Sequence, residues 1–260
     1  MLIGEPPPTQ GDVHFVLFGI PVRIHPFFWL VGVLLVAGEL FQAPDLREAL
    51  LVFLPWMMAL FVAILVHELG HAWAMRAYGF SPSIVLYGLG GLTSYNPGLA
   101  YTARGTGTWA QVLISVAGPA AGFLLAALVA GVAKAAGYEV IVVLVARVLP
   151  LVVIPQTIGS EAFTLFLNDV LFISTFWGLI NLMPVYPLDG GQIARQLLMH
   201  INPRDGIRQS LVLSTATGIG LAVFALVALP RPLLPILFFG YLAYMSYVML
   251  QAYSSGGWWR

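Results

Sequence analysis

The run ALLVFLPWMMALFVAILVHELGHAWAMRAY, from Ala49 to Tyr78, contains two histidines and, before Arg76, a single charged side chain, Glu68. As an α-helix, a run of this length rises about 45 Å, which is more than the roughly 30 Å hydrocarbon core of a bilayer. The two histidines, His67 and His71, flank Glu68 late in the run. The stretch therefore predicts a membrane-spanning helix with an ionisable cluster near its C-terminal end.

Composition indicates the solvent that the chain requires. Of 260 residues, 60% are hydrophobic and 8% are charged, and the formal net charge is zero. Soluble domains contain about 25% charged residues, so we expect a polytopic membrane protein in a lipid bilayer. A neutral chain with scattered basic residues excludes nucleic acid as an expected partner. The lack of cysteine excludes disulfides and thiolate metal ligands.

Six apolar runs are long enough, alone or with their flanks, to form membrane spans. They lie at Phe27–Phe41, Ala49–Tyr78, Thr108–Lys134, Val170–Val185, Leu211–Leu229 and Pro232–Tyr253. A seventh run, Val140–Pro155, is ambiguous between a span, an interfacial segment and a re-entrant segment. The predicted fold class is an all-α polytopic membrane protein with about six transmembrane helices and short membrane-associated β-hairpins.

Two stretches favour β-structure. Val13–Phe18 and Val22–His25 flank a Gly-Ile-Pro turn, and Ser81–Gly98 has β-branched and aromatic residues around several glycines. Open sheet edges do not face lipid, so these strands should pair with one another, face a cavity or lie at the interface. An unpaired edge there could receive an extended peptide by strand addition. The alternative is a hairpin that only connects two spans.

His67, Glu68 and His71 form the pattern His-Glu-x-x-His. On a helix, residues four apart share one face, so both imidazoles can reach one Zn²⁺ at about 2.0–2.1 Å while the glutamate can bind the metal's water. Ionisable groups inside a span cost about 2.5 kcal/mol or more and are functional by default. The alternative is a helix-end cluster whose groups hydrogen-bond to each other or reach water.

Two histidines leave a catalytic zinc one protein ligand short, because such sites have three protein ligands and an open position. The best candidate is Asp189, which follows Pro184 and Pro187 and precedes Gly190 and Gly191. Its alternative role is the N-cap of a helix that starts near Gln192, a common use of aspartate. From the residues alone, both roles stay open.

Four motifs together resemble the site-2 protease family of intramembrane zinc metalloproteases, in its compact form without PDZ or CBS domains. They are FGIPVRIHP at Phe18–Pro26, HELGH at His67–His71, AGPAAG at Ala117–Gly122 and NLMPVYPLDGG at Asn181–Gly191. The resemblance covers most of residues 13–200. It implies that one Zn²⁺ is bound by His67, His71 and Asp189, and that Glu68 is the catalytic base.

The resemblance also makes three further statements about this chain. Asn181 falls on the Asn of the family's Asn-x-x-Pro element and is expected to contact the substrate backbone. Gly122 departs from the pattern, because many members have Asn there, so a contact made by that Asn must be missing or supplied by another group. For Asp189 to meet the histidines, Val140–Pro155 must not cross the membrane once, and we expect it to be a peripheral or re-entrant helix.

The predicted function is hydrolysis of peptide bonds in or near transmembrane segments of membrane-protein substrates, as in regulated intramembrane proteolysis. An unwound substrate segment would pair with one of two short stretches, bounded by Ile84 and Tyr87 or by Leu92 and Tyr95. The alternatives are a divalent-metal transporter and an inactive membrane scaffold. Whether the chain forms an oligomer is left open.

We expect one membrane-embedded metalloprotease domain over residues 1–260, with an N-terminal β or interfacial segment at 1–26, a catalytic core at 49–200 and a C-terminal helix pair at 211–253. With a cytoplasmic N-terminus, the inside segments have more Lys and Arg than the outside ones, as the positive-inside rule requires. The inside set is Arg23, Arg76, Arg104, Arg195, Arg204, Arg208 and Arg260, and the outside set is Arg47, Lys134, Arg147 and Arg231. This predicts a multi-pass protein of the plasma (inner) membrane with its active site toward the cytoplasm.

Overall fold

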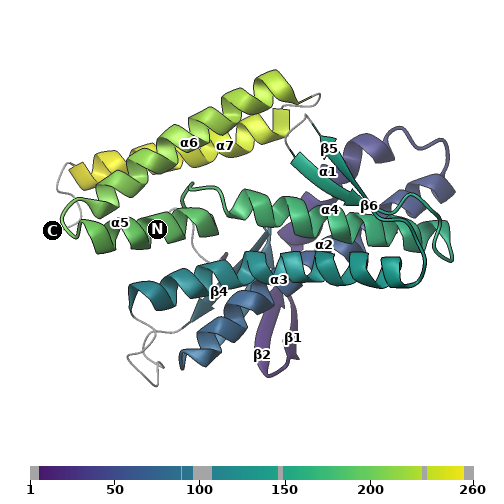
Figure 1. The fold of residues 1–260 in the computed structure, drawn as a ribbon, viewed down its shortest axis with the longest axis horizontal. Coiled ribbons are helices and arrows are strands. Elements are labelled where there is room, and N and C mark those ends of the chain that lie inside the picture. The colour runs from purple at the N-terminus through teal and green to yellow at the C-terminus, as the bar shows by residue number, and fades with distance from the viewer. Residues whose placement is uncertain (1–5, 89, 96–106, 146–148, 230–232, 255–260) are drawn as a thin grey trace. The chain divides into compact units, whose positions relative to one another are not determined.

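The computed structural model describes residues 6–88, 90–95, 107–145, 149–229 and 233–254. Among these residues, five helices are long and apolar enough to cross a membrane. They are α2 (Leu46–Ala77), α3 (Thr108–Ala135), α4 (Glu161–Asn181), α6 (Gly206–Ala228) and α7 (Leu233–Ser254) (Figure 1). The predicted first span, α1 (Pro26–Leu40), is a shorter apolar helix of 15 residues, about 22 Å long. The polytopic helical fold class is therefore confirmed, with five long apolar helices and one shorter apolar helix, α1, among the described residues.

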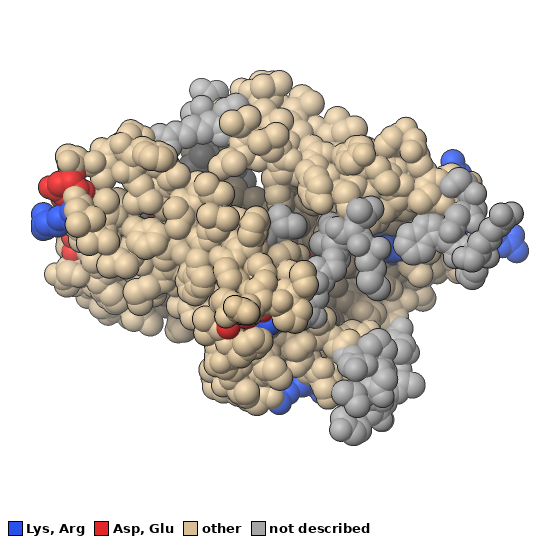
Figure 2. Space-filling view, turned by 180° about the vertical axis from the view of Figure 1, so that it is seen from behind, with Lys and Arg blue, Asp and Glu red and all other residues tan. Residues whose placement is uncertain are grey.

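The surface suits lipid better than water. On the face drawn in Figure 2, charged side chains are few and lie in small groups separated by wide uncharged surface. Large apolar side chains are exposed along the helices, among them Leu124 on α3, which is 70% exposed, and Val227 on α6, which is 82% exposed. Some residues used in the sequence predictions lie outside the described part of the chain, namely Asn96, Pro97, Gly98, Arg104, Arg147, Arg231 and Arg260.

The chain divides into two compact units, which are described separately. The first contains Ile3–Gly105 and Ala117–Gly178, and the second contains Thr106–Val116 and Leu179–Arg260.

A four-stranded sheet is the main β-structure of the first unit. Its strands are β1 (Val13–Leu17), β2 (Ile20–Ile24), β3 (Pro82–Tyr87) and β4 (Gly90–Tyr95), in the order β1-β2-β3-β4. Each predicted hairpin forms, and the two are joined by parallel pairing of β2 with β3. The strands thus pair with one another, which was one of the three environments that the sequence left open.

The sheet packs on the helix that carries the His-Glu-x-x-His motif. Ile84 and Leu86 of β3 are almost fully buried in one core with Phe28 of α1 and Ala63 of α2. At the C-terminal end of α2, the guanidinium of Arg76 donates to the carbonyl oxygens of the turn between β1 and β2. The sheet is therefore fixed to the C-terminal half of α2 by apolar packing and by these hydrogen bonds.

The segment Val140–Pro155 is not a helix, and that part of the prediction was wrong. It forms a hairpin of β5 (Ile141–Val145) and β6 (Leu149–Val153), drawn as a pair of arrows in Figure 1. At the base of the hairpin, the main-chain N–H of Glu139 donates to the side-chain oxygen of Gln156 over 2.9 Å. The two ends of the segment thus lie together, so it does not cross the membrane once.

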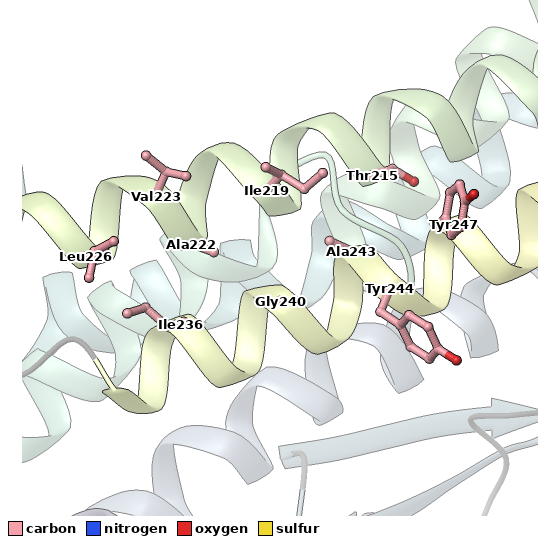
Figure 3. Close-up of a pocket in the computed structure, with 10 residues that line it drawn as sticks. All are labelled: Thr215, Ile219, Ala222, Val223, Leu226, Ile236, Gly240, Ala243, Tyr244 and Tyr247. Atoms are coloured by element: carbon pink, nitrogen blue, oxygen red, sulfur yellow. The ribbon is translucent and has the colours of Figure 1, made fainter.

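In the second unit, α5 (Asp189–Ile201) precedes α6 and α7, which pack side by side. Gly218 of α6 allows close approach, since a Cβ added there would lie 3.0 Å from the Cβ of Ala243 on α7. An apolar groove of about 410 Å³ runs along this helix pair (Figure 3). Its walls include Ile219 and Leu226 of α6 and Tyr244 of α7.

Candidate metal and catalytic site

The two motif histidines form a close pair on α2. His67 is 3% exposed and His71 is 7% exposed, and their Nε2 atoms lie 3.2 Å apart. Two nitrogens that bind one tetrahedral Zn²⁺ at about 2.0–2.1 Å lie about 3.3 Å from each other. The separation of the two imidazole nitrogens therefore fits a shared zinc ion, and their burial inside an apolar helix fits a protected site.

Small residues on α3 let that helix approach the histidines. A Cβ added at Gly118 would collide with Nε2 of His71. On the opposing helix, a Cβ added at Gly70 would collide with the carbonyl oxygen of Ala117. The backbones of α2 and α3 thus meet at the motif, which gives the AGPAAG segment a steric role beside the metal site.

Glu68 is held by strand β4. It is 4% exposed, and the hydroxyl of Thr93 donates to its Oε2 over 2.6 Å. A Cβ added at Gly91 would collide with the Glu68 side chain, so the β4 backbone lies directly against the carboxylate. A buried carboxylate needs such hydrogen bonding, because an unpaired one is costly to desolvate. The structure therefore brings His67, Glu68 and His71 together in the first unit.

Asp189 lies in the second unit as the first residue of α5. The N-cap of this helix is Leu188, without a side-chain capping bond, so the alternative role of Asp189 as N-cap of a helix from Gln192 is wrong. A Cβ at Gly190 would collide with the carbonyl oxygen of Leu182. The glycines after Asp189 thus let the preceding turn fold back onto the start of the helix.

Comparison with known proteins identifies the family. The sequence profile of peptidase family M50 matches residues 55–225, which include the HELGH, AGPAAG and LDGG segments. The chain belongs to peptidase family M50. Its central residues thus carry the motifs of a metallopeptidase family.

Two curated relatives of this M50 family member are named zinc metalloproteases. A putative zinc metalloprotease of Synechocystis is 28% identical over 74% of this chain and 45% of its own length. A zinc metalloprotease of Methanocaldococcus jannaschii is 24% identical over 82% of this chain and 52% of its own length. The chain spans about half the length of these relatives. Zinc is thus the metal named in both.

A solved structure shares the fold of this M50 family member. The site-2 protease from Methanocaldococcus jannaschii superposes with a TM-score of 0.56 and 18% identity, covering 92% of this chain and 95% of that one. The fold predicted from the resemblance to the site-2 protease family is therefore confirmed.

In this M50 family member, Gly122, which departs from the site-2 protease pattern, lies where α3 closely approaches α4. A Cβ added there would meet one heavy atom, the carbonyl oxygen of Ser174, at 3.3 Å. Ser174 itself is 3% exposed, and its hydroxyl has no hydrogen-bond partner among the described residues. Asn181, the other residue expected to contact substrate, is buried as the last residue of α4.

The substrate stretches predicted on β3 need correction. β3 pairs with β2 on one side and with β4 on the other, so the backbone between Ile84 and Tyr87 has no open edge. Ile84 is also 1% exposed and belongs to the core. β4, with Leu92 and Tyr95, has no further strand beyond it among the described residues. Both edges of β3 are thus already paired at Ile84–Leu86, and strand addition stays a prediction for β4.

Sequence reasoning missed Thr93, Gly91 and Gly118 as parts of the site. Gly91 and Thr93 are two residues apart on a strand and therefore face the same side, toward Glu68. That alternation is visible in the sequence, but the partner of this face is not. Gly118 stood inside a quoted motif, yet its contact with His71 depends on how two helices cross.

Proposed function

We propose that this member of peptidase family M50 is an intramembrane zinc protease that cleaves membrane-protein substrates in or near their transmembrane segments. One observation supports this most: a buried His-Glu-x-x-His cluster within an apolar helix lies against β4, an edge strand with no further strand beyond it in the described part of the chain. Two candidate histidine ligands, a carboxylate base and a surface for an extended peptide are thereby combined in one unit.

The proposed metal ligands are His67, His71 and Asp189, each of which offers one ligand atom of a kind that zinc binds. The 3.2 Å separation of the two imidazole nitrogens supports the histidine part of this set. Two observations support Asp189 as the third ligand: it lies in the LDGG motif, and the N-cap of α5 is Leu188 and not Asp189. When bound, zinc lowers the pKa of water and polarises a peptide carbonyl.

Glu68 is the proposed general base. It takes the proton of the attacking water and later gives it to the amine that leaves, which is the usual exchange for a positioned carboxylate. Its burial and its bond to Thr93 keep the carboxylate in place between these two transfers.

The substrate is proposed to unwind before it is cut. The carbonyls of a transmembrane helix are bonded within the helix, so a cleavable carbonyl must first be released. The open edge of β4, from Leu92 to Tyr95, can satisfy the released backbone groups by strand addition. We place Asn181 among the substrate contacts on its motif alone, and the site toward the cytoplasmic side of the plasma (inner) membrane on the distribution of basic residues.

The test uses the purified full chain and a panel of single-span membrane proteins in detergent. Glu68→Gln should retain zinc, measured by mass spectrometry of the metal, and should lose cleavage. His67→Ala and Asp189→Ala should each lose zinc. Substantial cleavage by Glu68→Gln would refute the role of the base, and full zinc in Asp189→Ala would refute the third ligand.

The alternative hypothesis, that the protein is a divalent-metal transporter, predicts a different result. Transport would need ligands spread across the membrane depth, and the helices carry few acidic groups, such as Glu39 near the end of α1 and Asp169 within α4. Zinc uptake into liposomes that contain the chain, without any peptide cleavage, would favour transport over proteolysis.

A further inference from the structure

The register of the sheet determines which backbone groups of β4 point to its open edge. The N–H of His25 donates to the carbonyl oxygen of Leu86 over 2.9 Å, so the main-chain groups of Leu86 point toward β2. Leu86 lies opposite Gly91 in the pairing of β3 with β4. In an antiparallel pair, residues alternate between bonding inward and outward, so the N–H and C=O of Gly91, Thr93 and Tyr95 point away from β3. No strand among the described residues occupies that side.

The main chain and the side chain of Thr93 therefore point in different directions. Its main-chain groups lie on the open edge, while its side chain lies on the face of β4 that covers α2. The Thr93 hydroxyl is 2.6 Å from Oε2 of Glu68 and 3.1 Å from the main-chain oxygen of Glu68. A hydroxyl has one proton to donate, and the carboxylate oxygen is the nearer of the two acceptors, so the proton goes to the carboxylate.

We propose that Thr93 is a positioning residue that links substrate strand addition at β4 to the placement of the general base. A substrate strand that pairs with the N–H and C=O of Thr93 immobilises β4, and the Thr93 hydroxyl then holds Glu68 in its working position. The inference rests on the proposed function, because it assumes that Glu68 is the base and that substrate adds to β4. Thr93 takes no part in the proton transfer itself and acts through Glu68.

Gly91 supports the same link from a second direction. The β4 backbone is so close to Glu68 that no side chain fits at Gly91, which is the neighbouring outward-bonding residue of the strand. A shift of β4 would therefore displace the carboxylate both through the hydroxyl bond and through direct contact. Small misplacements of a catalytic group reduce rates strongly, by about 100-fold for about 1 Å.

The matched variants are Thr93→Val, which keeps the shape and removes the hydroxyl, and Thr93→Ser, which keeps the hydroxyl. Ser83→Ala serves as a control in the same sheet, since it removes a hydroxyl that lies 3.3 Å from that of Ser94. Cleavage of a single-span protein by the full chain is measured for kcat and KM. Zinc content and thermal unfolding are measured on the same samples.

Thr93→Val should lower kcat about 10- to 100-fold with KM near the wild-type value and zinc retained, as expected for a loss of base positioning. Thr93→Ser should recover most of kcat, and Ser83→Ala should match the wild type. An unchanged kcat in a folded, zinc-loaded Thr93→Val protein would overturn the proposal. So would an equal loss in Thr93→Ser.

A spectroscopic readout separates this proposal from the proposed function. The infrared carboxylate band of Glu68, isolated by subtracting the Glu68→Gln spectrum, should shift in Thr93→Val and stay in place in Thr93→Ser. An unshifted band would show that the hydroxyl does not hold Glu68. If the band shifts but the wild-type protein cleaves no substrate, the hydrogen bond from Thr93 to Glu68 is supported and the proposed protease function is refuted.

Discussion

The Nε2 atom of His71 occupies the space in which a side chain at Gly118 would begin. The two residues lie on different helices, α2 and α3, and His71 is 7% exposed. A side chain in such a packed place has little room to move unless one helix shifts. The fit of α3 against α2 thus determines the direction of one imidazole.

Gly118→Ala should weaken zinc binding at least about 10-fold, because loss of ligand orientation reduces metal affinity by about 10- to 100-fold. Zinc content after dialysis and competition with a chromogenic chelator measure the change. Gly131→Ala is a matched control on the same helix, since a Cβ there meets nothing within 4 Å. The control should bind zinc like the wild type. Equal zinc affinity in both variants would contradict the steric role of Gly118.

The sequence predicted the elements of the fold better than their partners. The two hairpins of the four-stranded sheet could be predicted from their own β-formers and turns, but the pairing of β2 with β3 joins strands separated by α1 and α2. Hydropathy and local pattern contain no term for such a distant contact. Thr93 escaped attention for the same reason, because its importance depends on Glu68 in another element.

Two errors in the sequence prediction, the start of α4 and the structure of the segment before it, come from judging both segments by apolar length. α4 begins at Glu161 and not near Val170, and it includes the polar Asn168, whose side chain is hydrogen-bonded inside the structure. Its side-chain oxygen accepts from the N–H of Ile154 over 2.8 Å, and its amide nitrogen donates to the carbonyl of Ile154 over 3.1 Å. The segment before it, Ile141–Val153, is rich in valine, which favours strands. That signal was present, but apolar length dominated the interpretation.

The ion pair at the N-terminal end of the sheet gives a pH prediction. Hydrogen bonds from Thr9 and then from Arg23, whose guanidinium is 2.8 Å from the carboxylate, hold the pKa of Asp12 well below its usual range. Because the pKa of Asp12 is lower in the folded state, its charge stabilises the fold at pH values above the unfolded pKa of about 3.9. This stabilisation is lost as the pH falls toward the folded pKa.

Asp12→Asn should therefore unfold at a lower temperature than the wild type near neutral pH. The difference should stay constant down to about pH 5 and become clearly smaller between about pH 4 and pH 2, because the unfolded carboxyl takes up a proton there while the folded one still resists it. Thermal unfolding in detergent at several pH values measures it. A difference that stays the same at every pH would show that the mutant is weakened by something other than this carboxylate's charge.

Arg76 connects the C-terminal end of α2 to the first hairpin. Its guanidinium donates to the carbonyl oxygen of Phe18 over 2.6 Å and to that of Gly19 over 3.0 Å. The turn needs this support, because Phe18 has a positive φ of 51°, which is uncommon for a bulky residue. The ring of Phe18 also packs on Trp73 of α2, with the ring centroids 5.8 Å apart.

Arg76→Ala should lower the free energy of unfolding by about 1–3 kcal/mol, because it removes two hydrogen bonds from a charged donor. Arg76→Lys should recover part of this loss, since an ammonium on a flexible stem lacks the planar fork that reaches both carbonyls. Arg47→Ala is the matched control, because Arg47 is exposed and 3.6 Å from Glu48, a surface pair of the kind that contributes about 0–1 kcal/mol. Thermal unfolding in detergent compares the three variants. If Arg76→Ala and Arg47→Ala lower the free energy of unfolding by equally small amounts, apolar packing alone holds the hairpin to α2. The hydrogen bonds of Arg76 then contribute nothing measurable.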